Sequence, residues 1–314
     1  MDNNKVSIVV SVYNEAQVLP RFYEELEAAL AGLGREHETI FVDDGSTDGS
    51  RELLDRLSAA DETVTAIHFS RNFGHEAAMI AGIDHASGDA IVCMDADCQN
   101  PPALLPSILQ RFNEGNDIVT MTREERADGG FLNHLSSRFF YALINRLSDT
   151  RLQPNASDFF LISRRVADVL RRDYRERTRF LRGVIQTVGF NATTLPYRAP
   201  QRAAGESHYH FSNLLHLAFS SIASFSKAPL KLGIYSGLLF GVLCIGLIVY
   251  SLVMWIVDRP VGGYTTLIIF LSAFAAVLLF VVGVIGYYVG IILDEVKGRP
   301  LYVIGYTSTN KDNN

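Results

Sequence analysis

The chain of 314 residues is long enough for a core-forming domain of ordinary size and a further region. Its formal net charge of −6 argues against the basic surface of a nucleic-acid-binding protein, so no nucleic-acid partner is expected. The three cysteines are an odd number without the spacing of metal ligands, and we interpret them as reduced thiols.

Apolar, β-branched runs alternate with stretches of helical periodicity in the N-terminal part of the chain. The first residues lack the pattern of a cleaved signal peptide, and none is expected. The alternation predicts an α/β fold with an open, mostly parallel, Rossmann-like sheet and helices on its faces. The predicted strands are 5–12, 38–42, 64–69, 90–94 and 117–121, and the predicted helices are 18–33, 51–59, 76–86 and 104–113.

Polar side chains follow each of the five predicted strands where the strand ends. They are Tyr13-Asn14-Glu15, Asp43-Asp44-Gly45-Ser46, Arg71-Asn72, Asp95-Ala96-Asp97 and Arg123. If the strands are parallel, these clusters share the carboxyl edge of the sheet, where open α/β folds bind ligands. Ordinary solvated loops are the alternative interpretation. The sequence contains neither a P-loop motif nor a Gly-x-Gly-x-x-Gly motif after the first strand, so those two nucleotide-binding classes are not expected.

Asp95 and Asp97 stand one residue apart, after an apolar strand and before a double proline. Two carboxylates this close rarely tolerate each other without a counter-charge, and a divalent cation can supply one. Oxygen ligands favour Mg²⁺ or Mn²⁺ over zinc. Such an ion would neutralise charge on a diphosphate leaving group. The alternative is a helix-capping aspartate beside a surface aspartate.

Two long runs without Asp, Glu, Lys or Arg dominate the C-terminal part, at 232–257 and 261–293. Each is long enough to cross the hydrocarbon core of a bilayer, which favours a transmembrane hairpin over two buried core helices. Lysine and arginine flank the open end of this hairpin, which predicts a cytosolic N-terminal domain and cytosolic termini. Before it, an apolar stripe over 211–228 predicts an amphipathic helix. That helix would lie in the membrane interface or pack on the domain or on a neighbouring subunit.

Six sequence blocks match a known family and occur in the right order. They are SIVVSVYNE (7–15), FVDDGSTDGS (41–50), SRNFGHEAA (70–78), DADCQNPP (95–102), ASDFFLISR (156–164) and RAAGESHY (202–209). With the sequences that enter the first span and leave the second, they resemble the polyprenyl-phosphate glycosyltransferases, family 2 enzymes with a GT-A catalytic domain. The family includes dolichyl-phosphate mannose synthases and bacterial undecaprenyl-phosphate glucosyltransferases. Two C-terminal spans resemble the bacterial branch.

The resemblance implies an inverting transfer of sugar from a nucleotide-sugar, foremost UDP-glucose, to undecaprenyl phosphate. The reaction would occur at the cytosolic face of the bacterial inner membrane and supply cell-envelope glycan modification. The expected partners are the nucleotide-sugar, the polyprenyl phosphate and the lipid bilayer, with Mg²⁺ or Mn²⁺ as cofactor, and a homo-oligomer is left open. The expected domains are a GT-A domain (1–210), an amphipathic region (211–230) and a transmembrane hairpin with a cytosolic tail (231–314).

The matching positions imply roles for single residues. The nucleotide-sugar would contact Tyr13, Glu15, Asp44 at the base, Asp95, Gln99 at the sugar, and Arg123 at a phosphate. Asp97, with Asp95, would hold the metal. Catalysis is assigned to Asp158 as base, Asp97 and Arg202, and the acceptor phosphate to Arg202 and His208. Because a phosphate monoester is already anionic near neutral pH, Asp158 could instead orient the acceptor or the sugar, or cap a turn.

The chain departs from the family pattern at several positions, and residues 286–295 lack the family's usual glutamate and arginine. Ser11 replaces a proline, Cys98 and Asn100 replace leucine and aspartate, and His208 replaces a lysine. The sugar preference is therefore open, and UDP-GlcNAc, GDP-mannose and a UDP-aminopentose are alternative donors. A processive polysaccharide synthase is less well supported, because the chain has no Gln-x-x-Arg-Trp motif. A non-catalytic membrane adaptor with a GT-A fold is the alternative from another class.

Overall fold

The computed structural model describes residues 5–124, 156–176, 181–198, 200, 228–257 and 262–310. It divides into two compact units. The first unit consists of Met1–Tyr141, Leu152–His210 and Pro300–Asn314, and the second of Ala142–Arg151 and Phe211–Arg299.

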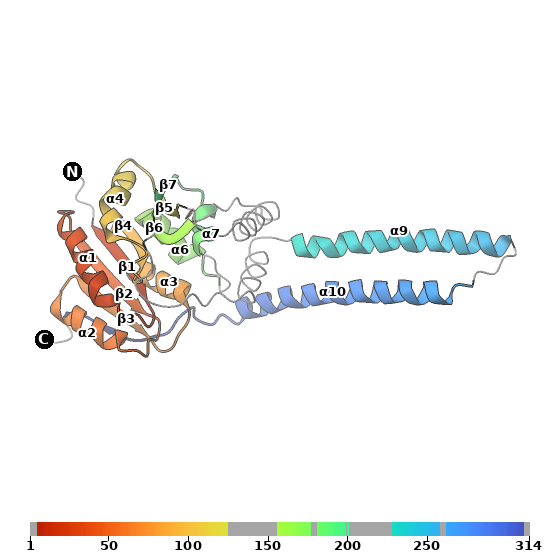
Figure 1. Cartoon of the computed structure of the whole chain (residues 1–314), viewed down its shortest axis with the longest axis horizontal. Helices are drawn as coiled ribbons and strands as arrows, with labels where there is room; N and C mark the ends of the chain where they lie inside the picture. The colour runs from red at the N-terminus through yellow and green to blue at the C-terminus, as the bar shows by residue number, and fades with distance from the viewer. Residues whose placement is uncertain are drawn as a thin grey trace. The chain divides into compact units, whose positions relative to one another are not determined.

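The first unit is built on an eight-stranded sheet with helices between the strands (Figure 1). Its strand order is β7-β5-β6-β4-β1-β2-β3-β8. The strands are β1 (Val6–Val12), β2 (His37–Asp43), β3 (Val64–Phe69), β4 (Ala90–Asp95), β5 (Ile118–Arg123), β6 (Ala156–Ser163), β7 (Ala192–Tyr197) and β8 (Ile304–Ser308). The helices are α1 (Leu19–Ala31), α2 (Ser50–Ala60), α3 (His75–His85), the 3₁₀ turn η1 (Pro102–Leu104), α4 (Leu105–Asn113), α6 (Arg164–Asp173) and α7 (Leu181–Thr187).

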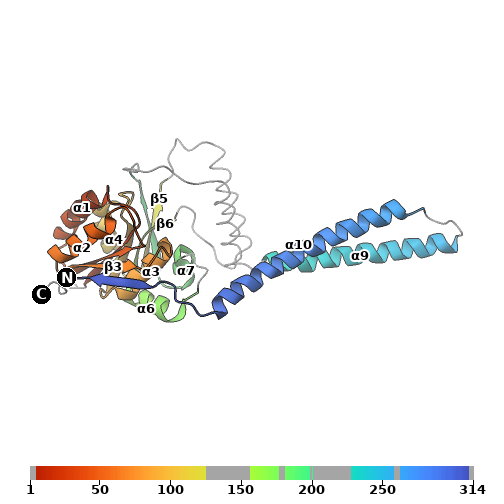
Figure 2. The same cartoon turned by 90° about the horizontal axis from the view of Figure 1, so that it is seen from below.

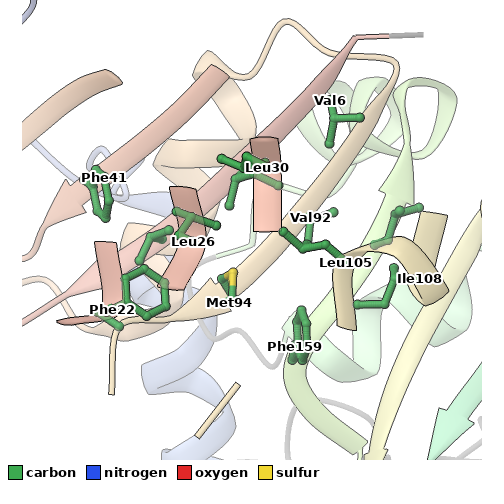
Figure 3. Packing of buried hydrophobic residues seen from close by; sticks show 14 of the residues in the cluster. Val6, Phe22, Leu26, Leu30, Phe41, Val92, Met94, Leu105, Ile108 and Phe159 are labelled. Carbon is green, nitrogen blue, oxygen red and sulfur yellow. The ribbon is translucent and has the colours of Figure 1, made fainter. Parts of the chain in front are cut away.

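The central strands have alternating side chains that enter two different cores. In β1, Val6, Ile8 and Val10 belong to the core under α1 and α4, while Val9 belongs to the core under α3 and α6. This two-residue period is the geometry of a strand buried on both faces, and it explains why Val6–Val12 is mostly apolar. Figure 3 shows Phe22, Leu26 and Leu30 of α1 beside Val92 and Met94 of β4 in the first core.

The predicted open α/β sheet is confirmed, and its five predicted strands agree with β1 to β5 within one or two residues. The sheet is mixed, because β6 lies antiparallel between β4 and β5 and β8 lies antiparallel on the outer side of β3. The reversal of β6 has a consequence for the site. Its first residues, including Asp158, lie at the edge where the parallel strands end.

The second unit contains two long helices, α9 (Ala228–Ile256) and α10 (Tyr264–Val296), which lie side by side (Figure 1). Within them, Gly233–Met254 and Thr266–Val296 are long and apolar enough to cross a membrane, and neither window is buried inside the protein. The predicted pair of apolar C-terminal helices is thus present. The predicted amphipathic helix falls almost entirely on residues 211–227, outside the described part of the chain.

After α10 the chain returns to the first unit as β8, which the sequence did not predict. Residues 300–314 were expected to be a tail of the hairpin, but Ile304–Ser308 pair with β3. Figure 2 shows β8 running along the outer side of β3. One edge strand of the sheet therefore comes from the C-terminal part of the chain.

Candidate active site

The candidate site lies at the carboxyl edge of the sheet, where β1 and β4 are neighbours. Ser11 of β1 is paired in register with Asp95 of β4. From β1 the strand order runs through β2 and β3 to one side and through β4 to the other, so this is the point where the order of strands reverses. Open α/β sheets bind ligands at such a point.

Three side chains meet at this edge from three separate elements. His75 begins α3, Asp95 ends β4, and Asp158 lies near the start of β6. The His75 Nδ1 atom lies 3.4 Å from Asp95 Oδ1, and its Nε2 atom lies 3.7 Å from Asp158 Oδ2. One ligand atom from each residue falls within a group no wider than 4.8 Å, a size that suits one metal ion.

The surroundings of Asp95 disfavour the ionised form of its carboxyl. Burial raises the pKa of its carboxyl, the His75 imidazole opposes that rise, and the nearby Asp158 and Asp97 carboxylates add to it. A bound divalent cation would reverse the balance, because it favours the ionised form of every carboxylate around it. The group could hold a divalent cation, and among the described residues the buried His75 Nε2 atom has no hydrogen-bond partner.

Ser11, which replaces the family's usual proline, is part of the site. Its Oγ donates to Asp95 Oδ1 at 3.2 Å and lies 2.9 Å from His75 Nδ1. A proline could supply neither contact. Ser11 therefore links β4 to the start of α3, a role the sequence did not reveal.

Asn100, the other departure, is fully buried and contacts Asp95 directly. Its Nδ2 donates to Asp95 Oδ2 at 3.2 Å, and its Oδ1 accepts from the Tyr197 hydroxyl at 3.0 Å. Arg123 Nε in turn donates to the Tyr197 oxygen at 3.2 Å. Arg123 thus joins the site through Tyr197, with which it is paired in register across β5 and β7.

Asp158 is held from the other side by α7. Arg182 Nε lies 2.8 Å from Asp158 Oδ1. Next to this pair, Glu76 Oε2 accepts from the Leu181 backbone N–H at 2.9 Å. Burial raises the pKa of Glu76 to about 7, although the bond from Leu181 opposes the rise. Sequence reasoning missed Arg182 and Glu76, because nothing in their spacing from Asp158 places them beside it.

Residues 43–50 form the loop after β2. We call them the nucleotide loop, because the sequence predicts that Asp44 in this loop contacts the base. Both oxygens of Asp44 accept backbone N–H groups, from Phe73 at 2.6 Å and from Gly74 at 2.9 Å. Asp44 is almost completely buried, and burial raises the pKa of its carboxyl against these two bonds. Asp44 therefore fixes the entry to α3, and its contact with a base stays a prediction.

The residues after β1 are attached to the same loop by three backbone bonds. Asn14 N–H donates to Ser46 Oγ at 3.0 Å, and Glu15 N–H donates to Ser50 Oγ at 2.9 Å. The Thr47 N–H donates to Asn14 Oδ1 at 2.8 Å. Tyr13 remains half exposed beside this junction. The turn that carries the predicted nucleotide contacts Tyr13 and Glu15 is thus bonded to the loop that contains Asp44.

Asp97, the second aspartate of the pair, has different contacts from Asp95. Cys98 adopts a left-handed backbone conformation with φ +58°, and the Gln99 N–H donates to Asp97 Oδ1 at 2.9 Å. Within the described residues, His75 and Asp158 join Asp95 in the group that can hold a metal, and Asp97 is not a member. The roles of Asp97 in metal binding and of Gln99 at the sugar stay predictions. Arg202 and His208 lie outside the described residues.

His75 is the most informative residue that the sequence did not assign. It stands inside the SRNFGHEAA block at the same sheet edge as the acidic pair, so its position after the third strand was the available signal. Gly74 before it has φ +99°, a conformation open mainly to glycine, and this turn starts α3 at the site.

Comparison with known proteins identifies the class of chemistry at this edge. Residues 7–171 match the family model of Glycosyl transferase family 2. The chain belongs to glycosyl transferase family 2. It is 38% identical over 301 residues to an uncharacterized glycosyltransferase of Bacillus subtilis (strain 168), covering 95% of this chain and 92% of that protein.

A second relative has a more specific name. The family 2 chain is 35% identical over 307 residues to a prophage-derived bactoprenol glucosyl transferase of Shigella flexneri, covering 96% of this chain and 97% of that protein. Among solved structures, mannosyl-3-phosphoglycerate synthase from Rubrobacter xylanophilus aligns with a TM-score of 0.47 and 16% identity, over 70% of this chain and 72% of that one. The family model and the two relatives together identify the protein as a glycosyltransferase.

Proposed function

We propose that this family 2 glycosyltransferase transfers glucose from UDP-glucose to undecaprenyl phosphate, with inversion at the anomeric carbon. The observation that carries the proposal is the meeting of Asp95 and Asp158, which come from β4 and β6 and lie on either side of His75 at one sheet edge. The names of relatives that align with almost the whole chain support the glucosyl group and the bactoprenol carrier.

Donor binding is assigned to the surface formed by Tyr13, Glu15 and the nucleotide loop. Asp95 and Asp97 follow this surface at the end of β4 and would carry the cation, with His75 as a further ligand. The cation, Mg²⁺ or Mn²⁺, would neutralise the negative charge that develops on the leaving diphosphate. The protein's part is to orient the donor so that the anomeric carbon faces the acceptor.

Asp158 stands on the acceptor side of the same group. A phosphate monoester has a second pKa of about 6, so the nucleophile is largely ionised at neutral pH and gives up few protons. Asp158 takes the remaining proton and orients the acceptor, and Arg182 fixes the Asp158 carboxylate in place. Arg202 and His208 are proposed to bind the acceptor phosphate.

The path of the chain supports a proposed membrane topology. Residues 304–308 pair with β3, so they lie on the same side of any membrane as the sheet. In the sequence, both apolar helices lie between β7 and β8. If each helix crosses the membrane once, the chain returns to the side on which it started. We therefore propose a hairpin in the bacterial inner membrane with the catalytic unit and the C-terminal residues in the cytosol, where the nucleotide-sugar is available.

The test is a panel of donors. The purified full chain in bilayer discs is incubated with undecaprenyl phosphate, Mn²⁺ or Mg²⁺, and in turn UDP-glucose, UDP-GlcNAc, GDP-mannose and a UDP-aminopentose. A lipid-linked β-glucose formed from UDP-glucose, and lost in the Asp95→Asn variant, supports the proposal. Turnover with another donor alone would replace glucose by that sugar. Metal-dependent UDP binding without any lipid product would instead favour a non-catalytic adaptor.

A further inference from the structure

We propose that β8 is part of the donor site, because Tyr306 and His68 position the nucleotide loop (residues 43–50) for nucleotide binding. This inference rests on the proposed function, since it takes that loop to be the nucleotide subsite. It assigns a role in donor binding to the segment that follows the membrane hairpin.

Tyr306 makes three contacts from β8. Its ring stacks on the imidazole of His68, with ring centroids 4.4 Å apart and planes 20° from parallel. Its hydroxyl donates to Asp55 Oδ2 at 2.9 Å, and the guanidinium carbon of Arg51 lies 5.9 Å from the centre of its ring. Burial and the bond to Asp55 raise the pKa of Tyr306 to about 12, so the hydroxyl remains a donor at neutral pH.

His68 connects Tyr306 to the loop. It is completely buried in β3, and each of its ring nitrogens faces a carboxylate. The Nδ1 atom lies 3.0 Å from Asp43 Oδ2, and the Nε2 atom lies 3.2 Å from Asp55 Oδ1. A buried imidazole between two carboxylates has one acceptable ring orientation, and the stacked Tyr306 ring holds it there.

Asp43 connects His68 to the nucleotide loop. Its Oδ1 accepts the Ser46 N–H at 2.8 Å, and its Oδ2 accepts from Arg51 Nε at 3.0 Å. Arg51 also donates from Nη2 to the Phe69 carbonyl at 3.2 Å, which ties the start of α2 to β3. Asp43 at the start of the loop therefore contacts His68 and Arg51, and both of these side chains lie against the Tyr306 ring.

The other side of the loop holds the predicted nucleotide contacts. Ser46 and Ser50 accept the backbone N–H groups of Asn14 and Glu15, as described above. A displacement of the loop would therefore move the Tyr13–Glu15 turn together with Asp44. Nucleotide affinity depends on preorganisation of such groups, because a site that must order itself on binding loses part of the interaction energy. Tyr306 and His68 are positioning residues in this scheme and touch no substrate.

The experiment measures UDP binding to the full chain by calorimetry in the presence of Mn²⁺, with GDP as a parallel titrant. We expect Tyr306→Ser to raise the UDP dissociation constant about tenfold, and Tyr306→Phe, which keeps the stacked ring, to raise it no more than about threefold. Amide hydrogen exchange without nucleotide provides a second readout. The amides of 44–50 should exchange faster in Tyr306→Ser than in the wild type.

Two control variants separate positioning from general stability. Asn310→Ala removes another bond of the C-terminal segment, from Asn310 Nδ2 to the Ala59 carbonyl at the far end of α2. Leu30→Ala opens a cavity in the core under α1, away from the loop. Both should bind UDP with wild-type affinity. If Tyr306→Ser does not fold, Tyr306→Leu, which covers His68 with an apolar side chain, carries the same expectation.

Three results would overturn the inference. One is wild-type UDP affinity in a folded Tyr306→Ser or Tyr306→Leu variant. Another is an equal loss of affinity in Leu30→Ala, which would show that only global stability matters. The third is a wild-type chain that binds neither UDP nor GDP, which would refute the proposed function as well. The wild-type titration thus distinguishes a failure of the function from a failure of the inference.

Discussion

The side-chain amide of Asn100 donates from Nδ2 to Oδ2 of Asp95 at 3.2 Å, and the same amide accepts the Tyr197 hydroxyl at its other end. An aspartate at position 100, the residue usual in the resembled family, could accept from Tyr197 but could not donate to Asp95. The substitution therefore neutralises a position that would otherwise add a third carboxylate beside Asp95 and Asp97.

Asn100→Asp should consequently make folding more dependent on metal. The new buried carboxylate faces Asp95 without a donor, and we expect a loss of roughly 1–3 kcal/mol of unfolding free energy in metal-free buffer. Mn²⁺ should restore most of that loss, since it supplies the missing counter-charge. Thermal melts with and without Mn²⁺ measure the effect. The exposed Gln110→Glu change is the matched control, and an equal metal response in both variants would contradict the prediction.

Asp158→Asn should separate the transfer step from donor binding. Asparagine keeps the size of the side chain but loses the charge that faces Arg182 and that is proposed to take the proton. We expect kcat to fall about 100-fold while the UDP dissociation constant changes by less than about threefold. Asp117→Asn is the control, because Asp117 binds Arg165 and Ser163 at the opposite edge of the sheet. A kcat within twofold of the wild type would remove Asp158 from the mechanism.

Asp43 should contribute stability that depends on pH. Burial opposes its ionisation, but the bonds from His68, Ser46 and Arg51 outweigh burial and lower the pKa of the Asp43 carboxyl to about 2. Because the folded-state pKa lies below the unfolded value of about 3.9, the contribution of about 3 kcal/mol is complete above about pH 5. It is lost as the pH falls through about 2.

The measurement compares melting temperatures of the wild type and Asp43→Asn between pH 5 and pH 2. The difference between the two proteins should shrink as the pH falls, because the wild type alone loses this contribution. Other carboxylates titrate equally in both proteins and cancel in the comparison. A difference that stays constant over this range would show that the Asp43 carboxylate is not stabilised by its partners.

Gly45 should tolerate no side chain in the nucleotide loop. Its φ is +75°, and a Cβ atom there would lie 2.6 Å from the Arg71 carbonyl carbon and from the Asn72 nitrogen. Gly45→Ala should cost more than about 2 kcal/mol and weaken UDP binding. Gly34→Ala is the control, since φ is +60° but the space is open, and it should cost about 1 kcal/mol without affecting binding. Equal losses would show that backbone strain alone acts at Gly45.

Sequence reasoning predicted the central strands well because strands buried on both faces are continuous apolar runs. It missed β7, whose exposed and half-buried residues alternate at one edge, and β8, which has five residues at the other. It also missed β6, although the ASDFFLISR block was recognised. The place of β6 between β4 and β5 depends on contacts between distant residues, which no local pattern encodes.

The candidate site, like the fold, was predictable only where it depends on local sequence pattern. Polar residues at the ends of β1, β2 and β4 could be assigned to one edge from the parallel alternation alone. Asp158 came only from the resemblance, because the reversed β6 brings its first residues to that edge. The links made by Ser11, His75 and Arg182 depend on side-chain directions across strands and helices, and sequence spacing carries no information on these.

The pairing of β8 with β3 also fixes an order of events during synthesis. The outer edge of β3 is complete when residue 69 has been made, but its partner is encoded at 304–308, beyond both apolar helices. Until then β3 presents an open row of backbone donors and acceptors, the kind of edge on which chains aggregate. The sheet can gain β8 only after the ribosome has synthesised both apolar helices. Completion of the catalytic domain is thereby delayed until both apolar helices have been synthesised.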